Sequence, residues 1–223
     1  MALTLAFDVY GTLIDTSGVT LALQQHVGDR AGAFARLWRE KQLEYSFRRG
    51  LMQRYEPFTV CTQNALDYAC AFFAIELTDA DKARLMAAYR ILPAFAEVAD
   101  GLRVLQAAGH RMYAFSNGHP HDVENLLQHA NIHNQFIDVI SVHEVQSFKP
   151  DPAVYEHFLQ RTGTKHNEAW LVSSNPFDVI GAINVGMQAA WVKRSPDALF
   201  DPWGMQPTVT VSGLTELPAV LTA

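Results

Sequence analysis

The sequence has few cysteines, no excess of positive charge and no long hydrophobic run. Its 223 residues include two cysteines, Cys61 and Cys70, which cannot by themselves form a disulfide framework or a zinc site. Lysine and arginine number 17 against 23 acidic residues, and the net charge of −6 argues against a nucleic-acid partner, which needs a basic surface. No apolar run reaches the roughly 18 residues of a membrane span, and the N-terminus lacks the basic start of a secretory signal. We therefore expect a cytoplasmic protein that binds neither nucleic acid nor membranes.

Short apolar runs that end in polar residues recur along the chain. Six of them are predicted strands: 3–7, 111–115, 136–141, 169–172, 189–192 and 208–211. Between most of them lie segments with the apolar spacing of helices, beginning near residues 98, 122, 151 and 176. Strands that alternate with helices predict an α/β fold, in which helices cover both faces of a parallel sheet.

The segment from residue 15 to residue 96 breaks this alternation. It contains predicted helices at 17–27, 30–49, 58–74 and 79–91 and no convincing strand, and the last helix begins with a capping-box pattern, Thr78-Asp79-Ala80-Asp81. We expect residues 15–96 to form an all-helical cap over the loop of the first strand, and residues 1–14 plus 97–223 to form the core. Such caps exclude water and complete a site. The alternative is a set of helices with a purely structural role.

Polar side chains follow the predicted strands at four places. The motifs are Asp8-Val9-Tyr10-Gly11-Thr12, Ser116-Asn117-Gly118, Phe148-Lys149-Pro150 and Ser173-Ser174-Asn175-Pro176-Phe177-Asp178. Because the carboxyl ends of parallel strands share one edge of a sheet, we expect these motifs to converge on one crevice. Structural explanations also exist, since Asp8 could serve a turn around Gly11 and Asn175 could cap a helix at Pro176.

The order of these motifs, with a helical insertion after the first, resembles the haloacid dehalogenase superfamily over nearly the whole chain. The resemblance implies a Rossmann-like core with an inserted all-helical cap. Most members are magnesium-dependent phosphatases, which carry Asp-x-Asp in the first motif and Gly-Asp-x-x-x-Asp in the last. Here Tyr10 replaces the second aspartate and Ser173-Ser174 replaces Gly-Asp, so an acid–base group and an acidic ligand suited to Mg²⁺ are missing. We expect no metal and no cofactor. A metal-dependent phosphatase, or an inactive module that binds a small acid or a protein, remains an alternative.

The motifs are more closely similar to those of the (S)-2-haloacid dehalogenases. The stretch Trp38-Arg39-Glu40-Lys41-Gln42-Leu43-Glu44-Tyr45 also resembles the helix that carries this family's arginine. The resemblance implies that the Asp8 carboxylate displaces halide from a short (S)-2-haloalkanoic acid, and that water hydrolyses the aspartyl ester to an (R)-2-hydroxy acid. Halide leaves without a proton, which explains Tyr10 at the position of the acid–base group. A homodimer is common in the family, but no residue pattern decides it here.

The resemblance also assigns roles to individual residues. Lys149 would pair with Asp8, Asp178 would be the base for ester hydrolysis, and the full catalytic set would be Asp8, Thr12, Lys149, Tyr155, Ser173, Asn175 and Asp178. Substrate-binding residues would be Ser116 with backbone amides near Val9, Tyr10 and Asn117 for the carboxylate, and Arg39, the Asn117 side chain and the Phe177 ring for the halide.

Other residues have weaker interpretations. Arg39, Leu43 and Phe47 share one face of a predicted helix, and Tyr10, Leu43 and Phe58 are candidates for the pocket wall. His119 and His121 lack an evident third ligand, so no metal site is predicted there. We interpret both cysteines as buried small side chains.

Overall fold

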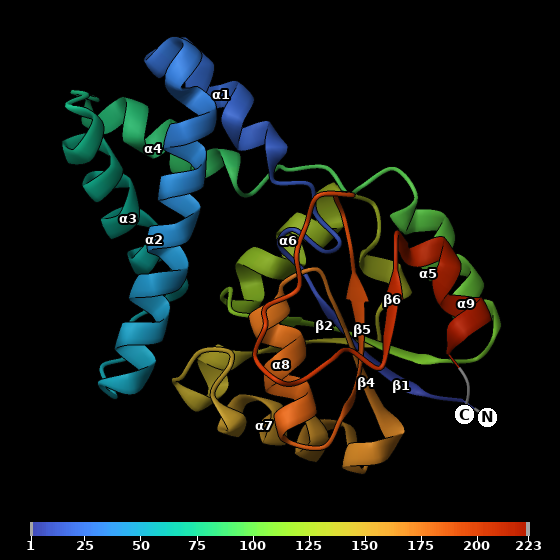
Figure 1. The fold of residues 1–223 in the computed structure, drawn as a ribbon. Helices are drawn as coiled ribbons and strands as arrows, with labels where there is room; N and C mark the ends of the chain where they lie inside the picture. Colours follow the sequence, from blue (N-terminus) through green and yellow to red (C-terminus); the bar gives the residue numbers. More distant parts are fainter. Residues whose placement is uncertain (1, 222–223) are drawn as a thin grey trace.

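Six parallel strands form the central sheet (Figure 1). The structure is a computed structural model and describes residues 2–221. The strands are β1 (Thr4–Asp8), β2 (Arg111–Ser116), β3 (Asp138–Ser141), β4 (Ala169–Ser173), β5 (Gln188–Val192) and β6 (Val209–Val211). They lie in the order β3-β2-β1-β4-β5-β6. The chain therefore changes direction across the sheet at β1, where open α/β sheets form a crevice beyond the carboxyl ends of the strands. This confirms the predicted α/β fold, although β3 begins at Asp138 rather than at residue 136.

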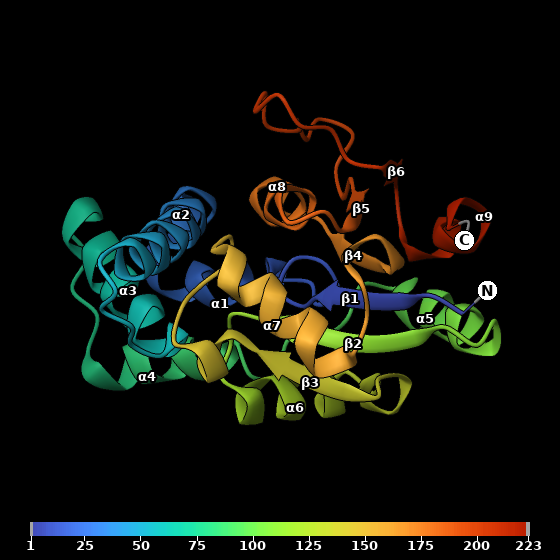
Figure 2. The ribbon, with the colours of Figure 1, turned by 90° about the horizontal axis from the view of Figure 1, so that it is seen from below.

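Helices cover both faces of the sheet (Figure 2). Alternate residues of β1 point to opposite faces: Leu5 and Phe7 join the apolar cluster under α5, α6 and α9, whereas Ala6 joins the cluster under α7 and α8. These core helices are α5 (Val98–Ala107), α6 (Pro120–His129), α7 (Pro152–Thr162), α8 (Pro176–Asn184) and α9 (Leu217–Val220). Short 3₁₀ helices are η1 (Gly28–Arg30), η2 (His133–Gln135), η3 (Val142–Val145), η4 (His166–Glu168) and η5 (Leu214–Glu216).

Four helices between β1 and α5 stand beside the sheet as a separate layer (Figure 1). They are α1 (Ser17–Val27), α2 (Ala31–Leu51), α3 (Phe58–Phe73) and α4 (Asp79–Ala88). The capping box of α4 is present, with the Thr78 side chain accepting from the Asp81 amide. The chain leaves and re-enters the sheet layer through two paired segments, in which Asp15 N donates to Pro93 O at 2.8 Å and Phe95 N donates to Leu13 O at 3.0 Å. We propose the boundary between cap and core at this pairing. Within residues 2–221, the helices are all too short or too polar to cross a membrane.

Candidate active site

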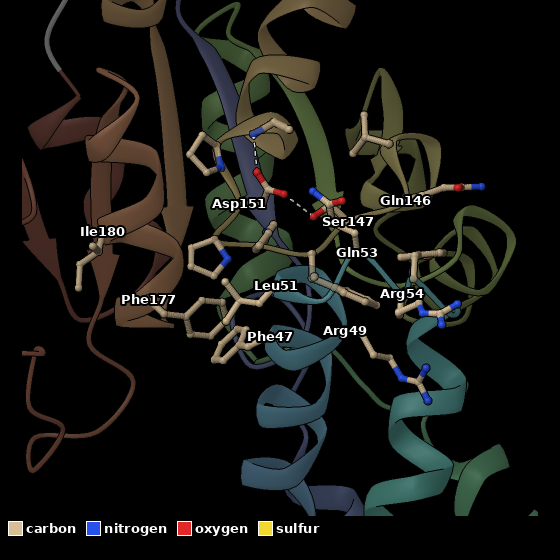
Figure 3. Close-up of a pocket in the computed structure, with 18 of the residues that line it drawn as sticks. Phe47, Arg49, Leu51, Gln53, Arg54, Gln146, Ser147, Asp151, Phe177 and Ile180 are labelled. Atoms are coloured by element: carbon tan, nitrogen blue, oxygen red, sulfur yellow. Dashed lines mark hydrogen bonds between the residues drawn. The ribbon is translucent and has the colours of Figure 1, made fainter.

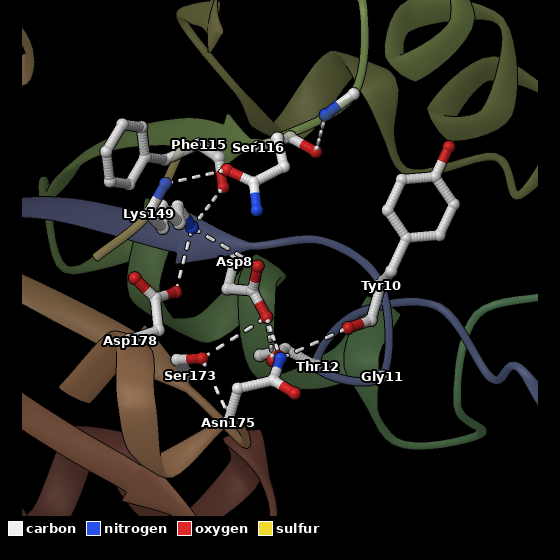
Figure 4. Close-up of polar contacts among 12 residues, drawn as sticks. Asp8, Tyr10, Gly11, Thr12, Phe115, Ser116, Lys149, Ser173, Asn175 and Asp178 are labelled. Atoms are coloured by element: carbon white, nitrogen blue, oxygen red, sulfur yellow. Dashed lines mark hydrogen bonds and ion pairs between the residues drawn. The ribbon is translucent and has the colours of Figure 1, made fainter. Parts of the chain in front are cut away.

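Asp8 ends β1, the strand between β2 and β4, and is only 8% exposed. Its two carboxylate oxygens have unequal surroundings (Figure 4). Oδ2 accepts three hydrogen bonds, from Thr12 Oγ1 at 2.7 Å, Asn175 Nδ2 at 2.8 Å and Ser173 Oγ at 3.2 Å. Oδ1 accepts from Lys149 Nζ at 3.2 Å. Together these hydrogen bonds fix the orientation of the carboxylate. The three neutral donors all bind Oδ2, and the charged donor binds Oδ1.

The loop after Asp8 folds back beneath the carboxylate. Gly11 adopts a φ of +82°, which favours glycine, and its amide donates to Ile14 O at 2.9 Å. This turn returns Thr12 to Asp8, where the threonine hydroxyl also accepts from Ser174 N at 2.8 Å. The Ser174 hydroxyl donates in turn to Gly11 O at 2.8 Å. The loops after β1 and β4 are thus joined directly, and they hold the donors to Asp8 in place.

Lys149 is 1% exposed and lies between two carboxylates. Its ammonium donates to Asp8 Oδ1 at 3.2 Å, to Asp178 Oδ2 at 2.8 Å and to the carbonyl of Phe115 at 2.9 Å. It also stands 4.2 Å from the centroid of the Phe115 ring. Three acceptors match the three donor positions of an ammonium group, so this buried charge is both paired and fully hydrogen-bonded.

Asp178, in the first turn of α8, is completely buried. Besides Lys149, it accepts a hydrogen bond from the Tyr155 hydroxyl at 2.8 Å on Oδ1. Burial raises the pKa of Asp178 to about 6, although the Lys149 charge opposes this rise. Burial and the nearby Asp178 carboxylate raise the pKa of Tyr155 well above its usual value, so the phenol stays a donor. Tyr155 is therefore linked to Lys149 indirectly: it hydrogen-bonds to Asp178, which in turn accepts a hydrogen bond from Lys149.

Asn175 occupies the N-cap position of α8, before Pro176, but its side chain makes no capping hydrogen bond. The amide nitrogen points to Asp8 instead, and the Asn175 backbone N–H donates to Ser173 Oγ at 3.1 Å. The helix-capping explanation of this side chain is therefore wrong.

The donors around Asp8 do not fit a divalent cation. The Asn175 amide nitrogen donates both to Asp8 Oδ2 and to the Tyr10 carbonyl, at 2.8 and 3.4 Å. Lys149 holds the other Asp8 oxygen and one oxygen of Asp178. Magnesium prefers an octahedral set of oxygen ligands, whereas here N–H groups already hold these oxygens. A metal-dependent step does not fit this arrangement of donors.

Ser116 ends β2 beside this network, and Asn117 follows it. The Ser116 hydroxyl accepts from Gly118 N at 3.0 Å, and the Asn117 side chain accepts from the Lys149 backbone N–H at 3.0 Å. Ser141, at the end of β3, donates to the Gly118 carbonyl at 2.6 Å and so holds the same loop. Val9 is 0% exposed, backbone included, so this structure does not open the Val9 amide to the predicted contact with substrate.

Two cavities flank the network. The Arg39 cavity, of about 470 Å³, is lined by Tyr10, Arg39, Phe58, Tyr89 and His119, among others. The Phe177 cavity, of about 1470 Å³, includes Phe47, Phe177 and Lys149 in its wall (Figure 3). The predicted halide ligands Arg39 and Phe177 thus line different cavities. Of the candidates for the pocket wall, Tyr10 and Phe58 line the Arg39 cavity, whereas Leu43 lines neither.

Among the described residues, the histidine and cysteine side chains do not form a metal site. The His119 ring packs on the His143 ring with centroids 4.6 Å apart, and His121 hydrogen-bonds to Asn125. Across residues 2–221, His, Cys, Asp and Glu side chains form no group of three that could hold a metal ion. Both cysteines are free and buried, as expected.

Comparison with known proteins shows the family of this chain. Residues 3–186 match the sequence model of the haloacid dehalogenase-like hydrolases. The chain belongs to this family. An (S)-2-haloacid dehalogenase of Pseudomonas putida is 38% identical over 96% of this chain and 93% of its own length. Haloacetate dehalogenase H-2 of a Moraxella species is 36% identical over 93% and 92% of the two chains.

Solved structures of the family extend this agreement. The L-2-haloacid dehalogenase of Xanthobacter autotrophicus, with chloropropionic acid covalently bound, superimposes with a TM-score of 0.89 at 30% identity. The match covers 99% of this chain and 98% of that one. The resemblance drawn from the four motifs and the inserted helices is confirmed, and the protein is a hydrolase of the haloacid dehalogenase family.

Sequence reasoning missed three contributors to the site. The Phe115 carbonyl receives Lys149, Ser174 ties the loop of Thr12, and Ser141 supports Gly118. A backbone carbonyl carries no residue-specific signal, and Ser141 is separated from Gly118 by 23 positions. Ser174 belongs to the fourth motif, which was expected to lie near Asp8, and this expected proximity was the only sign of its role.

Proposed function

We propose that this enzyme hydrolyses the carbon–halogen bond of short (S)-2-haloalkanoic acids through an ester of Asp8, releasing halide and an (R)-2-hydroxy acid. The unequal environment of the two Asp8 oxygens carries this proposal. One oxygen is surrounded by three neutral donors, and the other has a single ion-pair partner. A carboxylate arranged in this way has one oxygen for attack and one prepared to become a stabilised carbonyl oxygen.

In the first step, Asp8 Oδ1 attacks the carbon that bears the halogen. A new C–O bond forms, the carbon–halogen bond breaks, and the halide carries away the bonding electrons with inversion at carbon. No proton is transferred. A carboxylate that is 8% exposed has lost most of the water that would weaken it as a nucleophile.

In the second step, water attacks Cγ of the Asp8 ester. Negative charge then develops on Oδ2, where Thr12, Ser173 and Asn175 already point their donors, as in an oxyanion hole. Asp178 takes the proton of this water, because its pKa of about 6 leaves it ionised at neutral pH. Cγ–Oδ1 then breaks, and the oxygen leaves with the product, which takes the proton held by Asp178 as its new hydroxyl proton. The second proton of the attacking water passes from Asp8 to solvent, and both carboxylates are regenerated.

Substrate binding divides between the core and the cap. The substrate carboxylate binds Ser116 and the amides near Tyr10 and Asn117, and the leaving halide is held by Arg39, the Asn117 side chain and Phe177. Because Arg39 and Phe177 line separate cavities, the cap must turn toward the core before both contact one halide.

An isotope experiment tests the covalent route. Excess enzyme is mixed with (S)-2-chloropropionate in H₂¹⁸O for a single turnover, with EDTA present. We expect the label in Asp8 and unlabelled oxygen in the new hydroxyl, since water attacks the aspartyl carbon. Label in the first molecule of product would mean that water attacks the substrate directly. Asp8→Asn, as the control, should release no halide beyond traces from deamidation.

Two predictions concern the protein beyond its site. We propose a homodimer and a cytoplasmic location. Leu51 and Met52, at the end of α2, and Phe72 of α3 are exposed apolar side chains, which is consistent with contact to a second copy. Sedimentation equilibrium at micromolar concentration checks the dimer.

A further inference from the structure

The Phe177 cavity is larger than a short haloacid requires. Its volume of about 1470 Å³ exceeds the roughly 300–1,000 Å³ of ordinary ligand pockets. Its wall is divided in composition: Phe47, Leu51 and Phe177 lie together, with Ile180 further out along α8, whereas Arg49 and Arg54 stand on the opposite side (Figure 3). The part next to α8 is therefore the apolar part.

This apolar part includes a residue that is adjacent in the chain to the groups of the reaction centre. Phe177 stands between Asn175, which donates to Asp8, and Asp178, which accepts from Lys149. Its ring meets the ring of Phe47 edge to face, with centroids 5.1 Å apart and planes at 71°. Phe47 belongs to α2 in the cap, two turns after Arg39 on the same helix face. The pair thus joins cap and core in the wall of a cavity that Lys149, of the Asp8 network, also lines.

We propose that the Phe47–Phe177 pair is a partition that limits the length of the substituent on C2, and that the apolar part of the Phe177 cavity is a subsite for the alkyl chain of longer 2-haloalkanoic acids. This inference rests on the proposed dehalogenation. The occupant is an alkyl chain because Leu51 and Ile180 continue the apolar wall beyond the pair, while Arg49 and Arg54 stand on the opposite side. Each buried methylene strengthens binding about fourfold, so an open partition favours longer chains.

The experiment compares (S)-2-bromopropionate with (S)-2-bromohexanoate, so that leaving group and configuration stay constant. The measured quantity is the ratio of kcat/KM for the longer acid to that for the shorter. We expect Phe47→Ala to raise this ratio at least tenfold, and Phe47→Trp to lower it. Arg54→Ala is the matched control: Arg54 lines the same cavity on the side opposite the apolar part, so its replacement should change the ratio less than twofold.

A second variant tests the cavity itself. Ile180→Trp, introduced into Phe47→Ala, fills the apolar part and should return the ratio to the wild-type value. An unchanged ratio in Phe47→Ala, in protein that still melts cooperatively and turns over bromopropionate, overturns the partition. A gain that survives Ile180→Trp places the chain elsewhere and overturns the subsite. Failure of the wild-type enzyme to release bromide from either acid would instead contradict the proposed function.

Discussion

Lys149 joins the two carboxylates of the site. Its ammonium is the shared partner of Asp8 and Asp178 in a region closed to solvent. A buried ion pair contributes little net stability, but removal of one partner leaves a buried charge uncompensated. The functional and structural roles of this lysine are therefore linked.

Replacement of Lys149 tests that linkage. We expect Lys149→Met to lower the free energy of unfolding by about 3–5 kcal/mol at pH 7.5, because Asp8 and Asp178 then face each other without a cation. Urea denaturation measures this loss. It should shrink when the pH is lowered to 5, since Asp178 then gains a proton. A loss that is independent of pH would contradict the charge-based explanation.

Asp178 governs the second chemical step in our proposal. With Asp178→Asn, halide should appear as a burst of one per active site, while steady turnover falls about 10²–10⁴-fold because the base is missing. Mass spectrometry of the acid-quenched protein should then show Asp8 esterified with the carboxyalkyl group of the substrate. A variant without burst and without adduct would assign Asp178 to the first step instead.

The pH dependence of turnover reports the same group. Asp178 must be ionised to accept a proton, so kcat should fall as the pH drops below about 6. The Tyr155 hydrogen bond lowers the pKa of Asp178. Tyr155→Phe should therefore move the acidic limb of the kcat profile to higher pH, whereas a residue that only packs would leave the limb in place.

At the scale of elements, the packing of α7 on α8 positions Tyr155. Gly181 of α8 lies against this tyrosine, and a Cβ at position 181 would stand 2.4 Å from its hydroxyl and 2.8 Å from Pro150 Cβ. Both neighbours are part of the support for Asp178 and Lys149. The close approach of the two helices thus requires glycine at position 181. This approach positions the Tyr155 hydroxyl for its hydrogen bond to Asp178.

Two glycine substitutions separate stability from activity. Gly181→Ala should cost about 1–3 kcal/mol of unfolding free energy and reduce kcat at least tenfold, because Tyr155 must shift away from Asp178. Gly101→Ala creates a similar overlap, 2.7 Å from Leu214 Cβ, between α5 and η5. This control should lose stability but keep its kcat. Equal kcat values for the two variants, measured below their melting temperatures, would contradict the role given to the α7–α8 contact.

At the scale of the whole molecule, the cap rests on the core through a small set of side chains. Tyr55, in the loop after α2, stacks on Phe148 with centroids 5.0 Å apart and hydrogen-bonds to His143 Nδ1 at 3.0 Å. Arg90 pairs with Asp122 at 3.7 Å on the other side of the cap. These few side-chain contacts, and the two paired segments that link cap and core, are suited to a cap that opens and closes over the site.

Tyr55 therefore tests whether closure contributes to catalysis. Tyr55→Ala removes both the stacking and the hydrogen bond, each worth about 1 kcal/mol, and should lower kcat/KM for (S)-2-chloropropionate about tenfold or more. Tyr55→Phe keeps the ring on Phe148 and should lose less than Tyr55→Ala. A kcat/KM of the alanine variant within twofold of wild type would show that this contact does not limit the reaction.

The layers of the fold could be predicted from local patterns. Strands and helices follow from the spacing of apolar residues along the chain, and the capping box at Thr78 acts within a single turn. The convergence of Asp8 and Lys149, which are 141 positions apart, could also be predicted, because parallel strands bring their carboxyl ends to one edge.

The direction of each side chain was decided by tertiary contacts. Asn175 has the sequence of a helix cap, in which the side-chain oxygen would accept from a backbone N–H of the first turn. Its amide nitrogen instead donates to the Asp8 carboxylate, because a hydrogen bond to an ionised acceptor is stronger than one between neutral groups. Arg39 and Phe177 line two different cavities because of the way the cap packs against the core. The two long cap helices, α2 with 21 residues and α3 with 16, determine this packing. Residue types and their order along the chain specify which groups are available for chemistry; long-range packing decides which atoms of those groups meet.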